Sequence, residues 1–74
     1  MRMGKSAHIE ITTEYLKLEQ LLKIADLISS GGEAKIFLRE NEILVNGKKE
    51  DRRGRKLYPG DLVTIGGKVY EICR

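Results

Sequence analysis

The spacing of apolar residues changes twice along this sequence, and those changes limit the folds open to it. Ala7, Ile9 and Ile11 alternate with polar neighbours, which is the period-two pattern of a half-buried strand. From Leu18 the apolar residues stand three and four apart, as on one face of a helix. After Asn41, short apolar runs separated by turn residues restore a β pattern. The expected order is therefore a strand, a helical region and several further strands.

The helical region divides into two helices separated by a glycine pair. The first helix has four apolar residues on one face: Leu18, Leu21, Leu22 and Ala25. Its pattern breaks between Leu27 and Ser29, where we expect it to end. The second helix has a shorter apolar face: Ala34, Phe37 and Leu38. Because few residues join them, the two helices are expected to pack as a pair.

The turn between the helices contains a capping signal and a candidate phosphate site. Ser30 and Glu33 have the spacing of a capping box, in which each side chain accepts a hydrogen bond from the backbone amide of the other. No side chain covers the amides of Gly31 and Gly32, and they lie at the positive end of the helix dipole. This turn can therefore hold a phosphate group, although an ordinary tight turn between two helices explains the glycine pair equally well.

Turn residues divide the remaining chain into short strands. Asn46-Gly47 predicts a two-residue hairpin turn after the strand Ile43–Val45, because both residues tolerate positive φ angles. Residues 51–60 are expected to form a basic loop that ends in a Pro59-Gly60-Asp61 turn. Gly66-Gly67 predicts a second hairpin that sets Val63 opposite Tyr70. The core side of that hairpin would be Val63, Ile65, Tyr70 and Ile72.

These elements predict an α+β fold, with the helix pair covering the apolar face of a small, mostly antiparallel sheet of short strands. With 74 residues, the chain is expected to form a single domain over residues 7–74, preceded by a flexible segment over residues 1–6. The lone Cys73 and the lack of a long apolar run favour a cytoplasmic protein that is neither exported nor inserted in a membrane.

The residues for catalysis are scarce. The single histidine and the single cysteine stand near opposite ends of the sequence, and no phosphate-binding loop motif is present. His8 is expected to be a plain exposed side chain, because no Cys, Asp or Glu accompanies it at metal-ligand spacing. We therefore expect no catalytic residue, metal, cofactor or small-molecule substrate.

Positive charge, in contrast, is concentrated in one part of the chain. Residues 1–47 contain six basic and seven acidic groups, a net charge of −1, whereas residues 48–74 contain eight and four, a net charge of +4. Between Lys48 and Lys56, six of nine residues are basic. On the second helix, Lys35 and Arg39 are neighbours whose mutual repulsion an anion would relieve. A polyphosphate partner fits these groups, and a merely solvated hairpin is the less favoured interpretation of the cluster alone.

The aromatic residues bear on the kind of nucleic acid. Four are present, Tyr15, Phe37, Tyr58 and Tyr70, and two of these are assigned to the core. A platform for single strands needs more exposed rings. Recognition of a structured RNA through phosphates and shape is therefore favoured over base-by-base reading.

The motifs resemble a known family, the small RNA-binding domain named after ribosomal small-subunit protein four, also called the S-four domain or alpha-L motif. The resemblance covers most of residues 9–72 and is greatest to stand-alone bacterial members of the YaaA and YbcJ type. It rests on Ser30-Gly31-Gly32-Glu33-Ala34-Lys35, Val45-Asn46-Gly47, Arg52-Arg53-Gly54-Arg55-Lys56-Leu57 and Pro59-Gly60-Asp61.

The resemblance implies two helices against a small sheet and RNA binding by the helix pair and the adjacent hairpin. It assigns the family's basic residue at the start of helix one to Lys17 and that of helix two to Lys35. Other members often have arginine where Gly31 stands, and here the glycine amides would serve as donors. The full predicted RNA-binding set is Lys17, Lys23, Ser30, Gly31, Gly32, Lys35, Arg39, Lys48, Lys49, Arg52, Arg53, Arg55 and Lys56.

Two functions thus remain open on sequence grounds. The first is a monomeric, non-catalytic binder of structured RNA, such as ribosomal RNA or a ribosome-assembly intermediate. The second is a protein-interaction module that docks an acidic partner on the basic strip or an apolar segment on the helix pair.

Overall fold

The computed structural model describes the backbone of residues 5–74 and the side chains of residues 7–74. Its elements follow the order β1 (Lys5–Glu10), β2 (Leu16–Lys17), α1 (Leu18–Ile24), α2 (Gly31–Glu40), β3 (Ile43–Val45), β4 (Lys48–Lys49), β5 (Lys56–Leu57), β6 (Leu62–Ile65) and β7 (Lys68–Cys73). Five strands form one sheet in the order β1-β7-β6-β3-β4, and β2 pairs with β5 separately. The α+β prediction with a mostly antiparallel sheet is confirmed, and β1 with β7 is the parallel pair.

Both predicted hairpins are present. Asn46 and Gly47 have φ angles of 53° and 85°, as a type I′ turn between β3 and β4 requires. The Gly66-Gly67 turn joins β6 to β7, and Val63 lies opposite Tyr70 as predicted. The side chains assigned to the core face of this hairpin are all buried. Turn chemistry and alternation therefore predicted this half of the sheet correctly.

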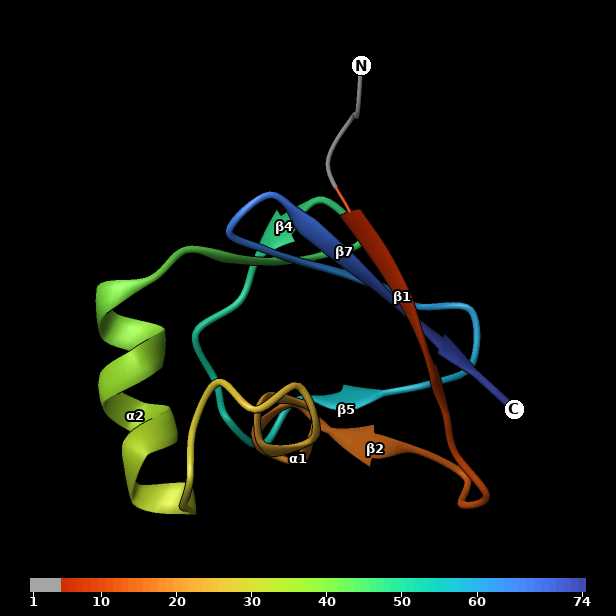
Figure 1. The fold of residues 1–74 in the computed structure, drawn as a ribbon, viewed down its shortest axis with the longest axis horizontal. Coiled ribbons are helices and arrows are strands. Elements are labelled where there is room, and N and C mark those ends of the chain that lie inside the picture. Colours follow the sequence, from red (N-terminus) through yellow and green to blue (C-terminus); the bar gives the residue numbers. More distant parts are fainter. Residues whose placement is uncertain (1–4) are drawn as a thin grey trace.

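The core lies between the five-stranded sheet and the helices. Figure 1 shows α2 along one flank, and α1 with the β2–β5 pair across the core from the sheet. Leu18, Leu21 and Leu22 of α1 are fully buried and belong to one apolar cluster with Ile43, Val63 and Ile72 of the sheet. The helix pair covers the sheet as expected. Within residues 5–74, no helix has the length and apolar character needed to cross a membrane.

Strand β1 begins at Lys5, two residues before the predicted boundary of the folded domain. Lys5 and Ser6, which the sequence analysis placed in a flexible segment, pair with Lys68 and Val69 of β7. The other residues of that segment, 1–4, lie outside the described part of the chain. The parallel β1–β7 pair brings the first and the last strand of the described chain side by side (Figure 1).

Helix α1 ends earlier than the apolar pattern predicts. Its last residue is Ile24, and Asp26 adopts a left-handed φ of 63°. The Asp26 amide donates to the Lys23 carbonyl and the Leu27 amide to the Leu22 carbonyl, which together form a Schellman motif. Glycine is the usual residue at this position of the motif. An aspartate there gives no clear indication in the sequence that the helix ends.

The predicted capping box at α2 is wrong. The helix starts after Ser30 as expected, but the Ser30 hydroxyl makes no capping hydrogen bond. The Glu33 carboxylate accepts from the amide of Ser29 instead of that of Ser30. The Glu33 carboxylate therefore binds one residue before the N-cap. Ser30 contacts Glu33 through its backbone carbonyl instead, which accepts a hydrogen bond from the Glu33 amide at 3.1 Å.

The region 51–60, predicted to be a loop throughout, contains strand β5. Leu57 of β5 pairs with Leu16 of β2 and is completely buried. Two-residue strands have no periodic pattern, so this pair had no signal in the sequence. The predicted turn that follows is present, with Gly60 at a φ of 99° and the Asp61 amide donating to the Tyr58 carbonyl at 2.9 Å.

Candidate nucleic-acid interface

Residues 48–56, named the basic segment from here on, are organised by one buried carboxylate. The Glu50 side chain is only 6% exposed. Its Oε2 accepts from Arg52 Nε at 2.9 Å and its Oε1 from Arg55 Nη1 at 2.8 Å. The sequence analysis assigned no role to Glu50. In the structure it is the residue that positions both guanidinium groups.

The charge of Glu50 is stabilised by these partners. The Arg52 guanidinium, which hydrogen-bonds to Glu50, lowers the pKa of this carboxyl from 4.5 to about 2, although burial acts in the opposite direction. Arg55 lowers it further. Arg52 nevertheless remains 72% exposed, and a guanidinium has five N–H donors. Both arginines are therefore fixed in place while donors remain for a further anion.

The start of α1 anchors the basic segment. The first amides of a helix have no partner within it. Here the Leu18 amide donates to the Arg55 carbonyl at 2.8 Å, and the Glu19 amide donates to the Arg53 carbonyl at 3.0 Å. The Lys17 amide is satisfied by Gln20 Oε1 at 2.9 Å. Helix α1 therefore holds the backbone of the arginine-rich stretch at two points.

Arg53 connects this stretch to the second helix. Its Nη1 donates to the Gly31 carbonyl at 3.2 Å, and its Nε lies 3.9 Å from Glu19 Oε1. Arg53 thus touches both helices and is part of what keeps the segment beside α2. A structural role of this kind was not apparent from the sequence.

The predicted phosphate site at Ser30, Gly31 and Gly32 is crowded by negative charge. The Glu33 carboxylate is bound to the Ser29 amide at this turn. Glu19 Oε1 would lie 3.5 Å from a side-chain carbon at Gly31. Because two carboxylates oppose an incoming phosphate, we leave these three residues out of the interface considered below.

Lys35 and Arg39 of α2 lie beside Lys49 of the basic segment. They line a shallow hollow together with Lys49 of β4 and with Asp51. All three basic side chains belong to exposed residues, and among the described residues none has a carboxylate within 4.0 Å. We call Lys35, Arg39 and the basic segment, Lys48 included, the basic surface.

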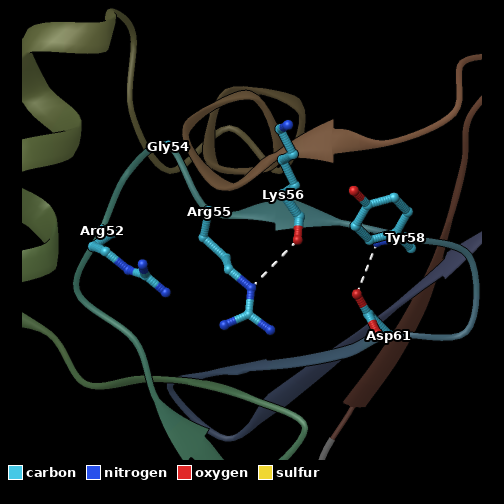
Figure 2. A pocket seen from close by; sticks show the side chains of 6 residues that line it. All are labelled: Arg52, Gly54, Arg55, Lys56, Tyr58 and Asp61. Carbon is cyan, nitrogen blue, oxygen red and sulfur yellow. Dashed lines mark hydrogen bonds between the residues drawn. The ribbon is translucent and has the colours of Figure 1, made fainter.

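Lys17 lies opposite Lys56, the last residue of the basic segment, in the β2–β5 pair. Lys56 Nζ lies 4.9 Å from the centre of the Tyr15 ring, a cation–π contact, and the Tyr15 and Tyr58 ring centres are 5.9 Å apart. The sequence analysis missed this tyrosine pair, because it depends on the unsignalled β2–β5 pairing. Figure 2 shows Tyr58 beside the hollow formed by the end of the basic segment.

Lys23 is exposed on the last turn of α1. None of the hollows, ion pairs or side-chain hydrogen bonds found in residues 7–74 joins it to the other predicted residues. The structure therefore does not bring Lys23 into the basic surface.

The parallel β1–β7 pair overturns one argument about His8. Its Nε2 lies 3.2 Å from Glu71 Oε1, and these atoms and Cys73 Sγ all lie within 4.8 Å of one another. The three residues could hold a metal ion, a possibility that sequence spacing had excluded. Burial, with the charges of Glu71 and Glu10, raises the pKa of the Cys73 thiol. That thiol is therefore a poor nucleophile at neutral pH.

Comparison of the whole sequence with known proteins identifies a family and several relatives. The family described as S4 domain matches residues 9–73. A Bacillus subtilis protein named "Probable ribosome maturation protein RlbA" is 59% identical over 59 residues, which cover 80% of this chain and 83% of that protein. An Escherichia coli protein named "Putative RNA-binding protein YbcJ" is 30% identical over 70 residues, covering 95% of this chain and 90% of that protein.

Proposed function

The chain belongs to the S4 domain family, and from this premise we propose that it is a non-catalytic protein that binds structured RNA. The observation that carries the proposal is the meeting of Lys35 and Arg39 of α2 with Lys49 of the hairpin. These side chains come from separate elements, and none is neutralised by an ion pair among the described residues. Cations that converge in this way suit the phosphates of a folded polyanion.

The geometry of the arginines favours a rigid, structured target. Arg52 and Arg55 are held by Glu50, and Arg53 is held by Gly31 and Glu19. Side chains that are already fixed lose less conformational entropy when they bind. Such a surface gains most from an RNA whose phosphates also have fixed positions, as in a duplex or a compact fold.

We infer ribosomal RNA or a ribosome-assembly intermediate as the target, and the cytoplasm as the compartment. The support is the Bacillus subtilis relative, whose name refers to ribosome maturation. We also propose that the binding unit is a monomer.

Crosslinking in cells tests this proposal directly. The protein is crosslinked to RNA in living bacteria, and the attached RNA is sequenced. Enrichment of ribosomal RNA or its precursors is expected. Recovery of RNA no greater than that of an unrelated basic protein of similar size would contradict the proposal.

A protein-docking function is the second candidate, and exposed apolar side chains on the helix pair favour it. Ile24 of α1 is 56% exposed and Ile36 of α2 is 52% exposed. Ribonuclease separates the two functions. If partners isolated with the tagged protein are lost after exhaustive ribonuclease treatment, RNA binding is supported; partners that survive support protein docking.

A further inference from the structure

We propose that Tyr58, supported by Tyr15, stacks on one unpaired base of the bound RNA. This inference rests on the proposed function and adds to it a class of target: a structured RNA with a nucleotide displaced from its helix. The sequence analysis set stacking aside because the rings were few. The structure brings two of them together next to the arginines.

Tyr58 has an accessible ring surface. Residue Tyr58 is 43% exposed, even though its neighbour Leu57 is completely buried. The Tyr15 and Tyr58 rings are 5.9 Å apart with a tilt of 52°, a favourable arrangement for aromatic pairs. Tyr15 therefore supports one side of the ring while part of Tyr58 stays open to a ligand.

The position of Tyr58 is fixed by the turn that follows it. The Tyr58 amide donates to Asp61 Oδ2 at 2.8 Å, and the Asp61 amide donates to the Tyr58 carbonyl at 2.9 Å. Asp61 is in turn held through Oδ1 by Asn46 Nδ2 at 3.1 Å. A ring that is held before binding loses little freedom when a base stacks on it.

Two arginines of the basic segment line the same hollow as Tyr58. Figure 2 shows Arg55 reaching into the same hollow, with Arg52 on its far side and Tyr58 opposite. The Lys56 ammonium lies over Tyr15, on the other side of the strand. A base on Tyr58 would therefore place its own phosphate close to fixed guanidinium groups. An ordinary apolar cover for Leu57 would need neither these cations nor an exposed ring.

The same geometry points to one displaced base rather than to a continuous single strand. Among residues 7–74, Tyr15 and Tyr58 form the one aromatic pair in contact, whereas Tyr70 is buried and Phe37 packs against the core. Successive stacked bases need successive rings. A bulge or a flipped nucleotide beside a duplex needs one.

The test compares two RNA hairpins that differ in one base. One hairpin has a bulged adenosine; the other has an abasic residue at the same place, so that the phosphates are unchanged. Affinity for each is measured with the unmodified protein and with Tyr58→Ala, Tyr58→Leu and Tyr58→Phe. Leucine retains an apolar cover without a ring, and phenylalanine retains the ring. Thermal melting of each variant reports whether the fold is preserved.

We expect the unmodified protein and Tyr58→Phe to bind the bulged adenosine at least about fivefold more tightly than the abasic hairpin, the lower end for one base–aromatic stack. Tyr58→Leu should bind both hairpins equally, at the affinity of the abasic one. Equal binding of both hairpins by the unmodified protein would overturn the stacking inference and leave RNA binding intact. Binding to neither hairpin would count against the proposed function itself.

Discussion

At the scale of residues, the Glu50 carboxylate is the group that positions two arginines of the basic segment. Glu50 is buried, and both Arg52 and Arg55 donate to it at 2.9 Å and 2.8 Å. A buried carboxylate is costly unless it is paired, so the arginines stabilise the fold at the same time as they are held in place for the proposed RNA binding. Under this proposal, stability and RNA binding depend on the same contacts.

Replacing Glu50 tests this shared role. For Glu50→Gln we expect a free energy of unfolding lower by about 1–2 kcal/mol at neutral pH; the fall in pKa to about 2 sets an upper limit of roughly 3 kcal/mol, reduced because Arg52 is exposed to water. The measurement is urea denaturation of both proteins.

The pH dependence of that difference has a definite sign. The folded-state pKa of Glu50 is lowered, so its contribution is present above the ordinary value of 4.5 and is lost as the pH falls towards about 2. The stabilities of Glu50→Gln and the unmodified protein should therefore converge in that range. A difference at pH 2.5 as large as that at pH 7 would contradict the account.

At the scale of elements, the end of α1 depends on an aspartate in an unfavourable conformation. Asp26 has a φ of 63°, which costs most residues about 1 kcal/mol and glycine almost nothing. Asp26→Gly should therefore raise the free energy of unfolding by about 0.5–1 kcal/mol. Asp26→Ala, measured beside it by thermal melting, should lower it. If Asp26→Gly instead lowers the free energy of unfolding, the Asp26 side chain contributes more to stability than its unfavourable φ angle costs.

The small β2–β5 pair is the element that joins core and interface. Leu57 is completely buried, and its neighbours Lys56 and Tyr58 are among the residues that line the hollow at the end of the basic segment. Leu57→Ala should lower the free energy of unfolding by about 2–4 kcal/mol, as for other large-to-small changes in a core. Denaturant titration provides the measurement. A loss below about 1 kcal/mol would mean that this pair contributes little to the fold.

The elements that sequence predicted correctly are those with a local signal. The Asn46-Gly47 and Gly66-Gly67 turns require positive φ, and the apolar faces of α1 and α2 follow a helical spacing. Elements without such a signal were missed: the two-residue strands β2 and β5, and the end of α1 at an aspartate. The burial of Glu50 was missed too. It depends on hydrogen bonds from Arg52 and Arg55, and a count of charged residues along the sequence does not distinguish these arginines from the other basic residues.

At the scale of the whole molecule, long-range pairing determines the chemistry. The parallel β1–β7 pair places His8 beside Glu71, and the β2–β5 pair places Tyr15 beside Tyr58. Neither contact could be read from spacing. The convergence of Lys35 and Arg39 with the basic segment was predicted and is present, because the helix order and the hairpin leave them adjacent.

The distribution of charge, rather than the net charge of +3, is the central claim at this scale. Binding through the basic surface requires that particular cations matter and that others do not. Lys35, Arg39 and Lys49 suit this test better than Arg52, Arg53 and Arg55, because no ion pair or side-chain hydrogen bond found in residues 7–74 involves them. Their replacement should leave the fold intact.

The salt dependence of RNA affinity for two matched variants measures this most directly. The first variant changes Lys35, Arg39 and Lys49 to glutamine, and the second changes Lys23, Lys68 and Arg74, so both lose the same charge. The first variant should bind a structured RNA more weakly. Its plot of log affinity against log salt concentration should have a slope shallower by roughly 2–3, because each lost phosphate contact removes about 0.7–0.9 from the slope. The second should keep the slope of the unmodified protein. Equal losses of slope in both variants would contradict a defined basic surface.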